Sequence, residues 1–157
     1  MGVMPIMTRP TTFQAADVCT LTGLSSHQLR EWTSRRGILP ADQPAQGRGR
    51  HARYAWNTVL VLRVLAQLHH EYGVEIGAWS ALAVAVRDDL SSSSPIGLYG
   101  RYLLISGGQY EITTPPFMLV QGAALIVRLD PHVEALAAGL GLPPPPTQRD
   151  LFPVARA

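Results

Sequence analysis

Lysine is absent from this 157-residue chain, so arginine supplies all 13 of its basic residues. There is one cysteine, Cys19, which excludes an intramolecular disulfide and a zinc site built on a cysteine pair. The sequence also lacks an apolar run long enough to cross a membrane, and its first residues contain no hydrophobic signal core. Its hydrophobic content of 46% is typical of a protein that can build a core. We therefore expect a folded, cytoplasmic protein with no membrane partner.

The arginines are unevenly distributed along the chain. Seven lie between His27 and Arg63, where Glu31 and Asp42 are the acidic residues, so this segment has a net charge of +5. The rest of the chain has six arginines and nine acidic residues, a net charge of −3. A GC-rich genome would explain the absence of lysine but not this clustering. A basic segment in an otherwise acidic chain indicates a surface that binds a polyanion.

A helix beginning after Ser25 has the strongest local signal in the sequence. Ser25 is a typical N-cap, and Gln28 completes an S-x-x-Q capping box. Leu24 and Leu29 occupy the two positions of a hydrophobic staple, which fixes how the chain enters a helix. Gly37 is expected to end this helix.

The apolar residues of the same helix predict which side faces the core. Leu29 and Trp32 are three residues apart and are expected to pack inward. The residues expected to face outward are Ser26, His27, Arg30 and Thr33.

A loop rich in proline, glycine and arginine follows at residues 40–53. It has two prolines, two glycines, three arginines and no apolar face, which is typical of a solvated hairpin. Tyr54 and Trp56 are expected to return the chain to the core.

Four further helices are expected, three in the first 90 residues and one near the end of the chain. One spans about 14–21, with Thr11 and Gln14 at capping-box spacing. A second spans about 57–72; its apolar surface, which includes Tyr72, is wide enough for burial on more than one side. A helix over about 75–89 follows. Beyond the β-rich segment, Asp130-Pro131 opens a short helix to about residue 140.

Between residues 98 and 129 the pattern changes to short strands. Segments 102–105 and 110–113 flank Gly107-Gly108, which predicts a β-hairpin. Residues 117–120 and 124–129 are expected to form further strands.

The predicted fold class is therefore α+β, with a winged helix-turn-helix domain of about four helices followed by a small β-rich C-terminal module. We expect a flexible arm at 1–10, the winged helix-turn-helix domain at 11–90, a linker at 91–97, the β-rich module at 98–141 and a proline-rich mobile tail at 142–157.

The order of motifs in residues 13–85 resembles the MerR family of transcriptional regulators. The matching motifs are L-T-G-L-S at 21–25, L-R-E-W at 29–32, G-I-L at 37–39 and R-Y at 53–54. The resemblance implies a winged helix-turn-helix whose second helix enters the major groove of DNA.

The resemblance also implies roles for individual residues. Ser26, His27 and Gln28 would lie near base edges or phosphates, and Arg30 matches an arginine that reaches the DNA backbone. Arg50 and Arg53 match phosphate-binding wing positions, and Tyr54 matches an aromatic residue that anchors the wing and can touch a phosphate. With the other arginines of the cluster, the expected DNA-binding residues are Ser26, His27, Gln28, Arg30, Arg35, Arg36, Arg48, Arg50, Arg53 and Tyr54.

Two features depart from the family pattern. Glu31 stands where many members have a tyrosine, and its negative charge would disfavour close approach of a phosphate. The long dimerising helix of the family is not evident after residue 90. The C-terminal half is expected either to pair strands with a second copy and so form a homodimer, or to bind an effector or another protein.

The remaining candidate sites have simpler structural explanations. The adjacent residues of His69-His70 point in different directions on a helix, so a surface pair is favoured over a metal site. Asp88-Asp89 is a solvated helix end, and Gly107-Gly108 precedes no helix that could complete a phosphate loop. We therefore expect no catalytic residue, no metal site and no cofactor.

Three functions fit these observations. The first is a transcriptional regulator that binds double-stranded DNA as a homodimer, with RNA polymerase as a further partner. The second is a phage or plasmid DNA-processing factor, such as an excisionase or a terminase-like protein. The third is a protein-interaction module in which the winged helix no longer binds DNA.

Overall fold

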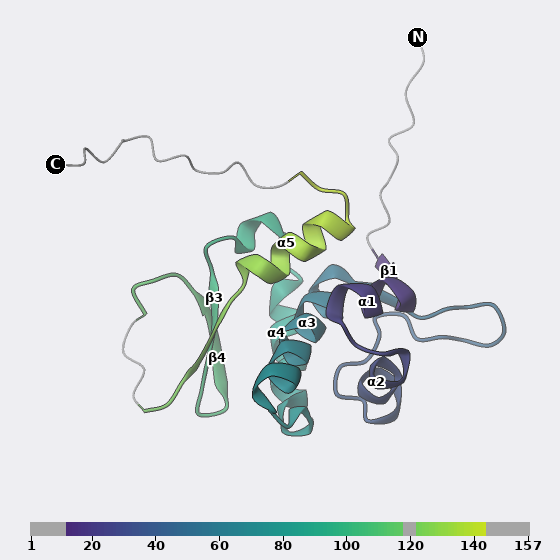
Figure 1. Cartoon of the computed structure of the whole chain (residues 1–157), viewed down its shortest axis with the longest axis horizontal. Coiled ribbons are helices and arrows are strands. Elements are labelled where there is room, and N and C mark those ends of the chain that lie inside the picture. Colours follow the sequence, from purple (N-terminus) through teal and green to yellow (C-terminus); the bar gives the residue numbers. More distant parts are fainter. Residues whose placement is uncertain (1–11, 118–121, 144–157) are drawn as a thin grey trace, which may run out of the picture.

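The computed structural model describes residues 12–117 and 122–143 and is organised around one long helix, α3 (Figure 1). The elements of the first half are β1 Thr12–Gln14, α1 Ala15–Thr22, α2 Ser26–Arg30, the π-helical turn η1 Glu31–Arg35, β2 Arg53–Ala55, α3 Trp56–Tyr72, the 3-10 turn η2 Ile76–Trp79 and α4 Ser80–Leu90. Those of the second half are the 3-10 turn η3 Ile96–Leu98, β3 Tyr102–Ser106, β4 Gln109–Thr113, β5 Leu125–Arg128 and α5 Asp130–Gly139. The α+β fold class is confirmed. Within the described ranges no helix is both long and apolar enough to cross a membrane.

Helix α3 is buried along most of its length, as its wide apolar surface predicts. Leu60 and Leu62 are fully buried, and α1, α4 and α5 all pack against the helix. The prediction that Tyr72 belongs to this buried surface is wrong, because its side chain is 68% exposed. Tyr72 is the last residue of α3, and Gly73 then turns the chain away with a φ of +64°.

The C-terminal half contains a three-stranded antiparallel sheet in the order β4-β3-β5. Gly107 and Gly108 join β3 to β4, and both have the positive φ that a tight two-residue hairpin turn requires. This confirms the predicted hairpin, and β5 confirms the strand predicted at 124–129. Of the strand predicted at 117–120, Phe117 lies in no strand and the other residues lie outside the described ranges.

The sheet and the helical part share one hydrophobic core. Leu103 and Ile105 of β3 and Val127 of β5 belong to the same buried cluster as the inner residues of α3 and α4. The phenol of Tyr110 in β4 also donates a 3.1 Å hydrogen bond to the carbonyl of Ala85 in α4. The sheet therefore packs directly against the helices.

Two local details in the N-terminal half differ from the predictions. The N-cap of α1 is Gln14, whose N–H donates to Asp17 Oδ2 at 3.1 Å, and not Thr11, which lies outside the described residues. Thr33 is buried and not outward-facing, because it lies four residues after the inward-facing Leu29 and so on the same face. Its hydroxyl donates to the carbonyl of Leu29 at 2.8 Å.

A buried polar cluster joins α1, α3 and α5. Arg63 of α3 donates to the carbonyl of Leu21 and, through Nε, to Nδ1 of His132 at 3.3 Å. Burial lowers the pKa of Arg63, and it also lowers the pKa of His132 to about 4, with the positive charge of Arg63 as the second cause. His132 is therefore neutral at pH 7 and accepts a hydrogen bond in the folded protein.

This arrangement predicts a specific loss of stability in acid. The unfolded chain takes up a proton on His132 below its ordinary pKa of about 6.5, whereas the folded chain resists it down to about 4. Stability from this residue is thus complete above pH 6.5 and falls through the window from 6.5 to 4, by about 3 kcal/mol. Urea unfolding at several pH values should show this loss in the wild type. His132→Asn, which keeps an acceptor for Arg63 but cannot titrate, should lack it; an identical pH dependence in both proteins would contradict the assignment.

Candidate nucleic-acid interface

The start of α2 has the predicted capping box. Ser25 Oγ accepts from the N–H of Gln28 at 3.1 Å, and Gln28 Oε1 accepts from the N–H of Ser25 at 3.0 Å. The other end of the Gln28 amide, Nε2, lies 3.4 Å from Nε2 of His70 in α3. Gln28 is thus engaged by the fold at both ends of its amide, which favours a structural role for it over base reading.

Three side chains on the outer face of α2 have no partner in the part of the chain that the structure describes. Ser26, His27 and Arg30 are all exposed. Across residues 12–117 and 122–143, no group forms a hydrogen bond or ion pair with any of these three side chains. Their polar atoms are therefore available to an external ligand.

Residues 43–53 form a protruding loop, which we call the wing (Figure 1). Its base is closed by two backbone hydrogen bonds between Gln43 and Arg53, at 2.8 and 3.1 Å. Gly47 and Gly49 have φ values of +66° and +88° and lie on either side of Arg48. Only glycine adopts this backbone conformation at little cost, so the two glycines shape the tip of the wing.

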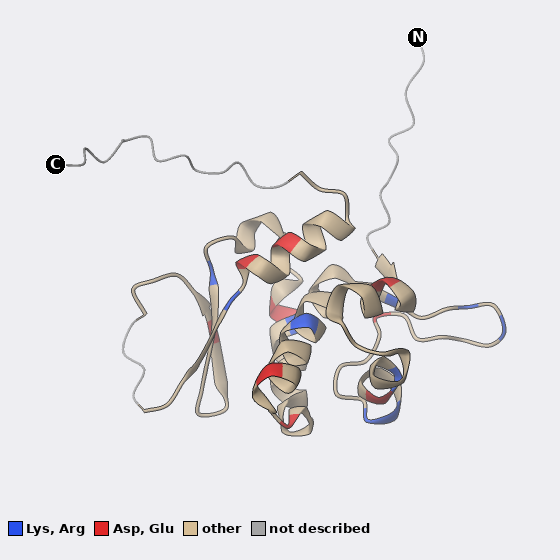
Figure 2. Ribbon diagram, in the orientation of Figure 1, with Lys and Arg blue, Asp and Glu red and all other residues tan. Residues whose placement is uncertain are grey.

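The wing tip presents two exposed arginines, Arg48 and Arg50. Neither side chain has a partner in the part of the chain that the structure describes. Basic ribbon segments gather on the wing and at the end of the α2–η1 helix, whereas much of the acidic ribbon lies on α3, α4 and α5 (Figure 2).

Arg53 and Tyr54 lie at the base of the wing rather than at its tip. Arg53 is half-buried in β2, where it pairs with Gln14 of β1 on one side and Gln43 on the other. The side chain of Tyr54 is only 3% exposed and belongs to the core. This burial favours the anchoring role of Tyr54 over contact with a phosphate.

Arg35 and Arg36 are engaged within the protein. Arg35 forms an ion pair with Glu31 at 2.7 Å, which also balances the negative charge expected to disfavour a phosphate. Arg36 pairs with Glu75 at 2.9 Å. The hydrogen bond from Arg36, together with one from the N–H of Gly77, lowers the pKa of Glu75.

A profile for the MerR HTH family of regulatory proteins matches residues 13–82. Residues 13–82 form a MerR-family DNA-binding domain. No curated protein matches the chain. The matched region runs from β1 into α4, so it contains α2 and the wing, and the β-rich sheet lies beyond it.

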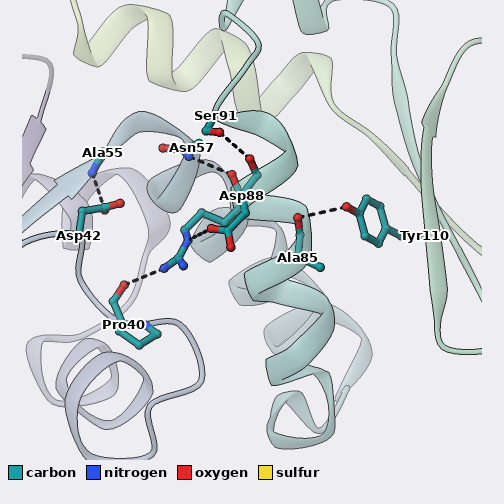
Figure 3. A network of polar contacts seen from close by, with 9 residues as sticks. Pro40, Asp42, Ala55, Asn57, Ala85, Asp88, Ser91 and Tyr110 are labelled. Carbon is teal, nitrogen blue, oxygen red and sulfur yellow. Dashed lines mark hydrogen bonds and ion pairs between the residues drawn. The ribbon is translucent and has the colours of Figure 1, made fainter.

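A polar network supports the wing of the MerR-family domain at its base (Figure 3). Asp42 Oδ2 accepts from the N–H of Ala55 at 2.7 Å, just before α3 begins. Arg87 of α4 donates to the carbonyl of Pro40 at 3.4 Å, and its own carbonyl accepts from Asn57 Nδ2 at 2.9 Å. These supporting residues were not identified from the sequence, because the partners lie 13 to 47 residues apart and follow no local spacing rule.

The adjacent histidines of the MerR-family domain have structural partners. The ring of His69 packs edge-to-face with Trp32, with centroids 5.6 Å apart, and its Nδ1 lies 3.0 Å from the carbonyl of Val74. In the described residues, no three His, Cys, Asp or Glu side chains gather closely enough to hold a metal ion.

The capping box predicts different effects for two neighbouring serines. Ser25→Ala removes the side-chain acceptor at the N-cap and should lower the free energy of unfolding by about 1 kcal/mol. Ser26→Ala removes an exposed hydroxyl that has no partner among the described residues, and should change the free energy of unfolding by less than about 0.5 kcal/mol. Thermal or urea denaturation of both variants measures this difference. Equal stabilities would show that the box contributes nothing to the fold.

Proposed function

We propose that this chain is a sequence-specific transcriptional regulator that places α2 in the major groove of double-stranded DNA and the wing on flanking phosphates. The observation that carries the proposal is a set of three exposed arginines, Arg30 on α2 and Arg48 and Arg50 on the wing, whose side chains have no partner among the described residues. Arginine binds phosphate through two parallel hydrogen bonds, and neutralising phosphates releases counterions from DNA. The match of residues 13–82 to the MerR family supports the proposal that the chain is a regulator that binds DNA.

The two parts of the surface are suited to different tasks. The arginines of the wing contact phosphates, which position a protein on DNA without reading sequence. His27, exposed at the start of α2, is the side chain best placed to read base edges, because Gln28 is held by Ser25 and His70. Arg35 and Arg36 must exchange Glu31 and Glu75 for phosphates before they can contribute to binding.

We further propose that the regulator acts as a homodimer in the cytoplasm, at sites where it meets RNA polymerase. One winged helix contacts few base pairs, so two copies on a two-fold symmetric site are needed to recognise a DNA sequence specifically. Chromatin immunoprecipitation with sequencing would test this assignment. Promoter sites favour regulation, whereas attachment or packaging sites would favour the DNA-processing alternative.

The wing arginines should set the salt dependence of binding. The double variant Arg48→Ala/Arg50→Ala loses two phosphate contacts, so the slope of log K against log salt should fall by about 2. Arg101→Ala is the matched control, because Arg101 is also exposed and lies outside the MerR-family domain. Fluorescence anisotropy with a mixed-sequence duplex measures both slopes. A wild-type slope in the double variant would remove the wing from the interface, and no association at low salt would refute DNA binding altogether.

Replacing His27 should alter which sequences are bound. His27→Ala should reduce discrimination at one or two positions of the site by about 1–3 kcal/mol, since a base-edge contact is lost. Selection from a random duplex library compares the preferred sites of variant and wild type. Arg50→Ala is the contrasting control and should weaken binding to all DNA sequences by the same factor. An unchanged preference for His27→Ala would exclude this residue from readout.

A further inference from the structure

The sheet has two edges, β4 and β5, and the hydrogen-bond pattern shows which backbone groups of β5 face outward. Leu129 donates its N–H to the carbonyl of Arg101 in continuation of the β3–β5 ladder. Hydrogen-bonded pairs alternate along an antiparallel ladder, so Leu125 and Val127 also bond toward β3. The N–H and C=O groups of Ile126 and Arg128 consequently point away from β3, along the outer edge of β5.

These outward groups lack a partner in the described structure. No residue in the ranges 12–117 and 122–143 accepts from or donates to the backbone of Ile126 or Arg128. The side chain of Ile126 is 46% exposed, and with Tyr72 and Ile96 it is one of the three large hydrophobic side chains exposed in the described residues. The Arg128 guanidinium folds back onto Asp130 at 2.8 Å, so it does not cover the edge.

The opposite edge strand has features that discourage pairing. Glu111 of β4 and Ile126 of β5 flank the same residue, Leu104 of β3, on the face of the sheet opposite to Leu103 and Ile105. A charged side chain on an edge strand and prolines just beyond it, here Pro115 and Pro116, are common means of preventing strand addition. Strand β5 has the apolar Ile126 at the position that matches Glu111, and its own charged residue, Arg128, is paired with Asp130.

We propose that the outer edge of β5 is the dimer interface, where it pairs antiparallel with β5 of a second copy of this chain. With Val127 on the two-fold axis, Ile126 lies opposite the partner's Arg128 and both outward pairs of groups are used, which gives four hydrogen bonds. The edge is self-complementary in this register, and a two-fold contact closes after two copies. Pairing of β5 with β4 would not close and would continue into a filament.

Two further observations favour a second copy as the occupant. Past residue 90 the longest described helix is α5, with 10 residues, and it is packed against α1 and α3, so it is not free to form an extended helical dimer interface. The sheet and the DNA-binding surface also lie on opposite sides of α3 and α4 (Figure 1). Pairing through β5 therefore leaves both copies of α2 and the wing uncovered. This inference depends on the proposed function in one respect, namely that a regulator bound to a two-fold symmetric DNA site is expected to be a dimer.

Two lysine variants test the interface by sedimentation velocity of the full chain without DNA. Ile126→Lys adds a charge to the proposed interface and should weaken dimerisation by at least about tenfold. Glu111→Lys places the same side chain beside Leu104 on the other edge and should leave the dimer unchanged. Ile126→Pro removes an outward N–H without touching the β3 ladder and should act like Ile126→Lys. Circular dichroism confirms that each variant is folded.

The outcomes separate this inference from DNA binding. Binding of each variant to a duplex carrying a single half-site is measured in parallel and should be the same in all, because the sheet is remote from α2. A wild type that remains monomeric both free and on DNA, or an Ile126→Lys variant as dimeric as the wild type, overturns the interface whether or not DNA is bound. Failure of the wild type to bind any duplex, with dimerisation lost in Ile126→Lys, would refute the proposed function and leave the interface supported.

Discussion

The structure depends above all on the burial of α3. Leu60 and Leu62 reach almost no solvent, and α1, α4 and α5 each cover part of the helix. Helix α3 is apolar around most of its circumference, whereas a helix on the surface of a domain buries only one apolar stripe. The helix-turn-helix alone therefore cannot bury all of the apolar surface of α3. The β-rich part supplies the remaining cover through Leu103 and Val127. The MerR-family domain and the sheet are therefore stabilised by one core, and removal of the sheet would expose apolar surface of the DNA-binding half.

Within this frame, the partners of each arginine determine which positive charges can reach DNA. Arg63 contributes to the charge of the basic segment in the sequence, yet it points between α1 and α5 and bonds to a carbonyl and a histidine. Arg35 and Arg36 are held by carboxylates on the surface, where an exposed ion pair is worth little and exchanges readily. Arg48 and Arg50 remain unpaired among the described residues. The net charge of residues 27–63 is thus larger than the positive charge that is available to a ligand. The arginines of the wing make up a larger share of this available charge than of the total number of arginines in the segment.

Sequence reasoning succeeded where the signal is local and failed where it is not. The pairs Ser25–Gln28 and Gly107–Gly108 predicted a helix start and a hairpin because each forms its contacts within four residues. The short strand β1 was missed, since three residues give no period and its partner β2 lies some 40 positions away. The inward course of Arg63 and the supports of the wing depend on tertiary contacts that no spacing rule encodes. For the site, the candidate residues could be listed from the sequence, but which of them are free could not.

One helix connects the two halves of the molecule mechanically. Arg87 of α4 bonds to Pro40 at the base of the wing, and Ala85, two residues earlier, accepts the hydrogen bond from Tyr110 of the sheet. Burial raises the pKa of Tyr110, so this phenol stays a donor throughout the neutral range. Packed interiors are close to rigid and pass displacements on rather than absorbing them. The placement of the sheet relative to the base of the wing therefore depends on α4, which bonds to both through residues two positions apart.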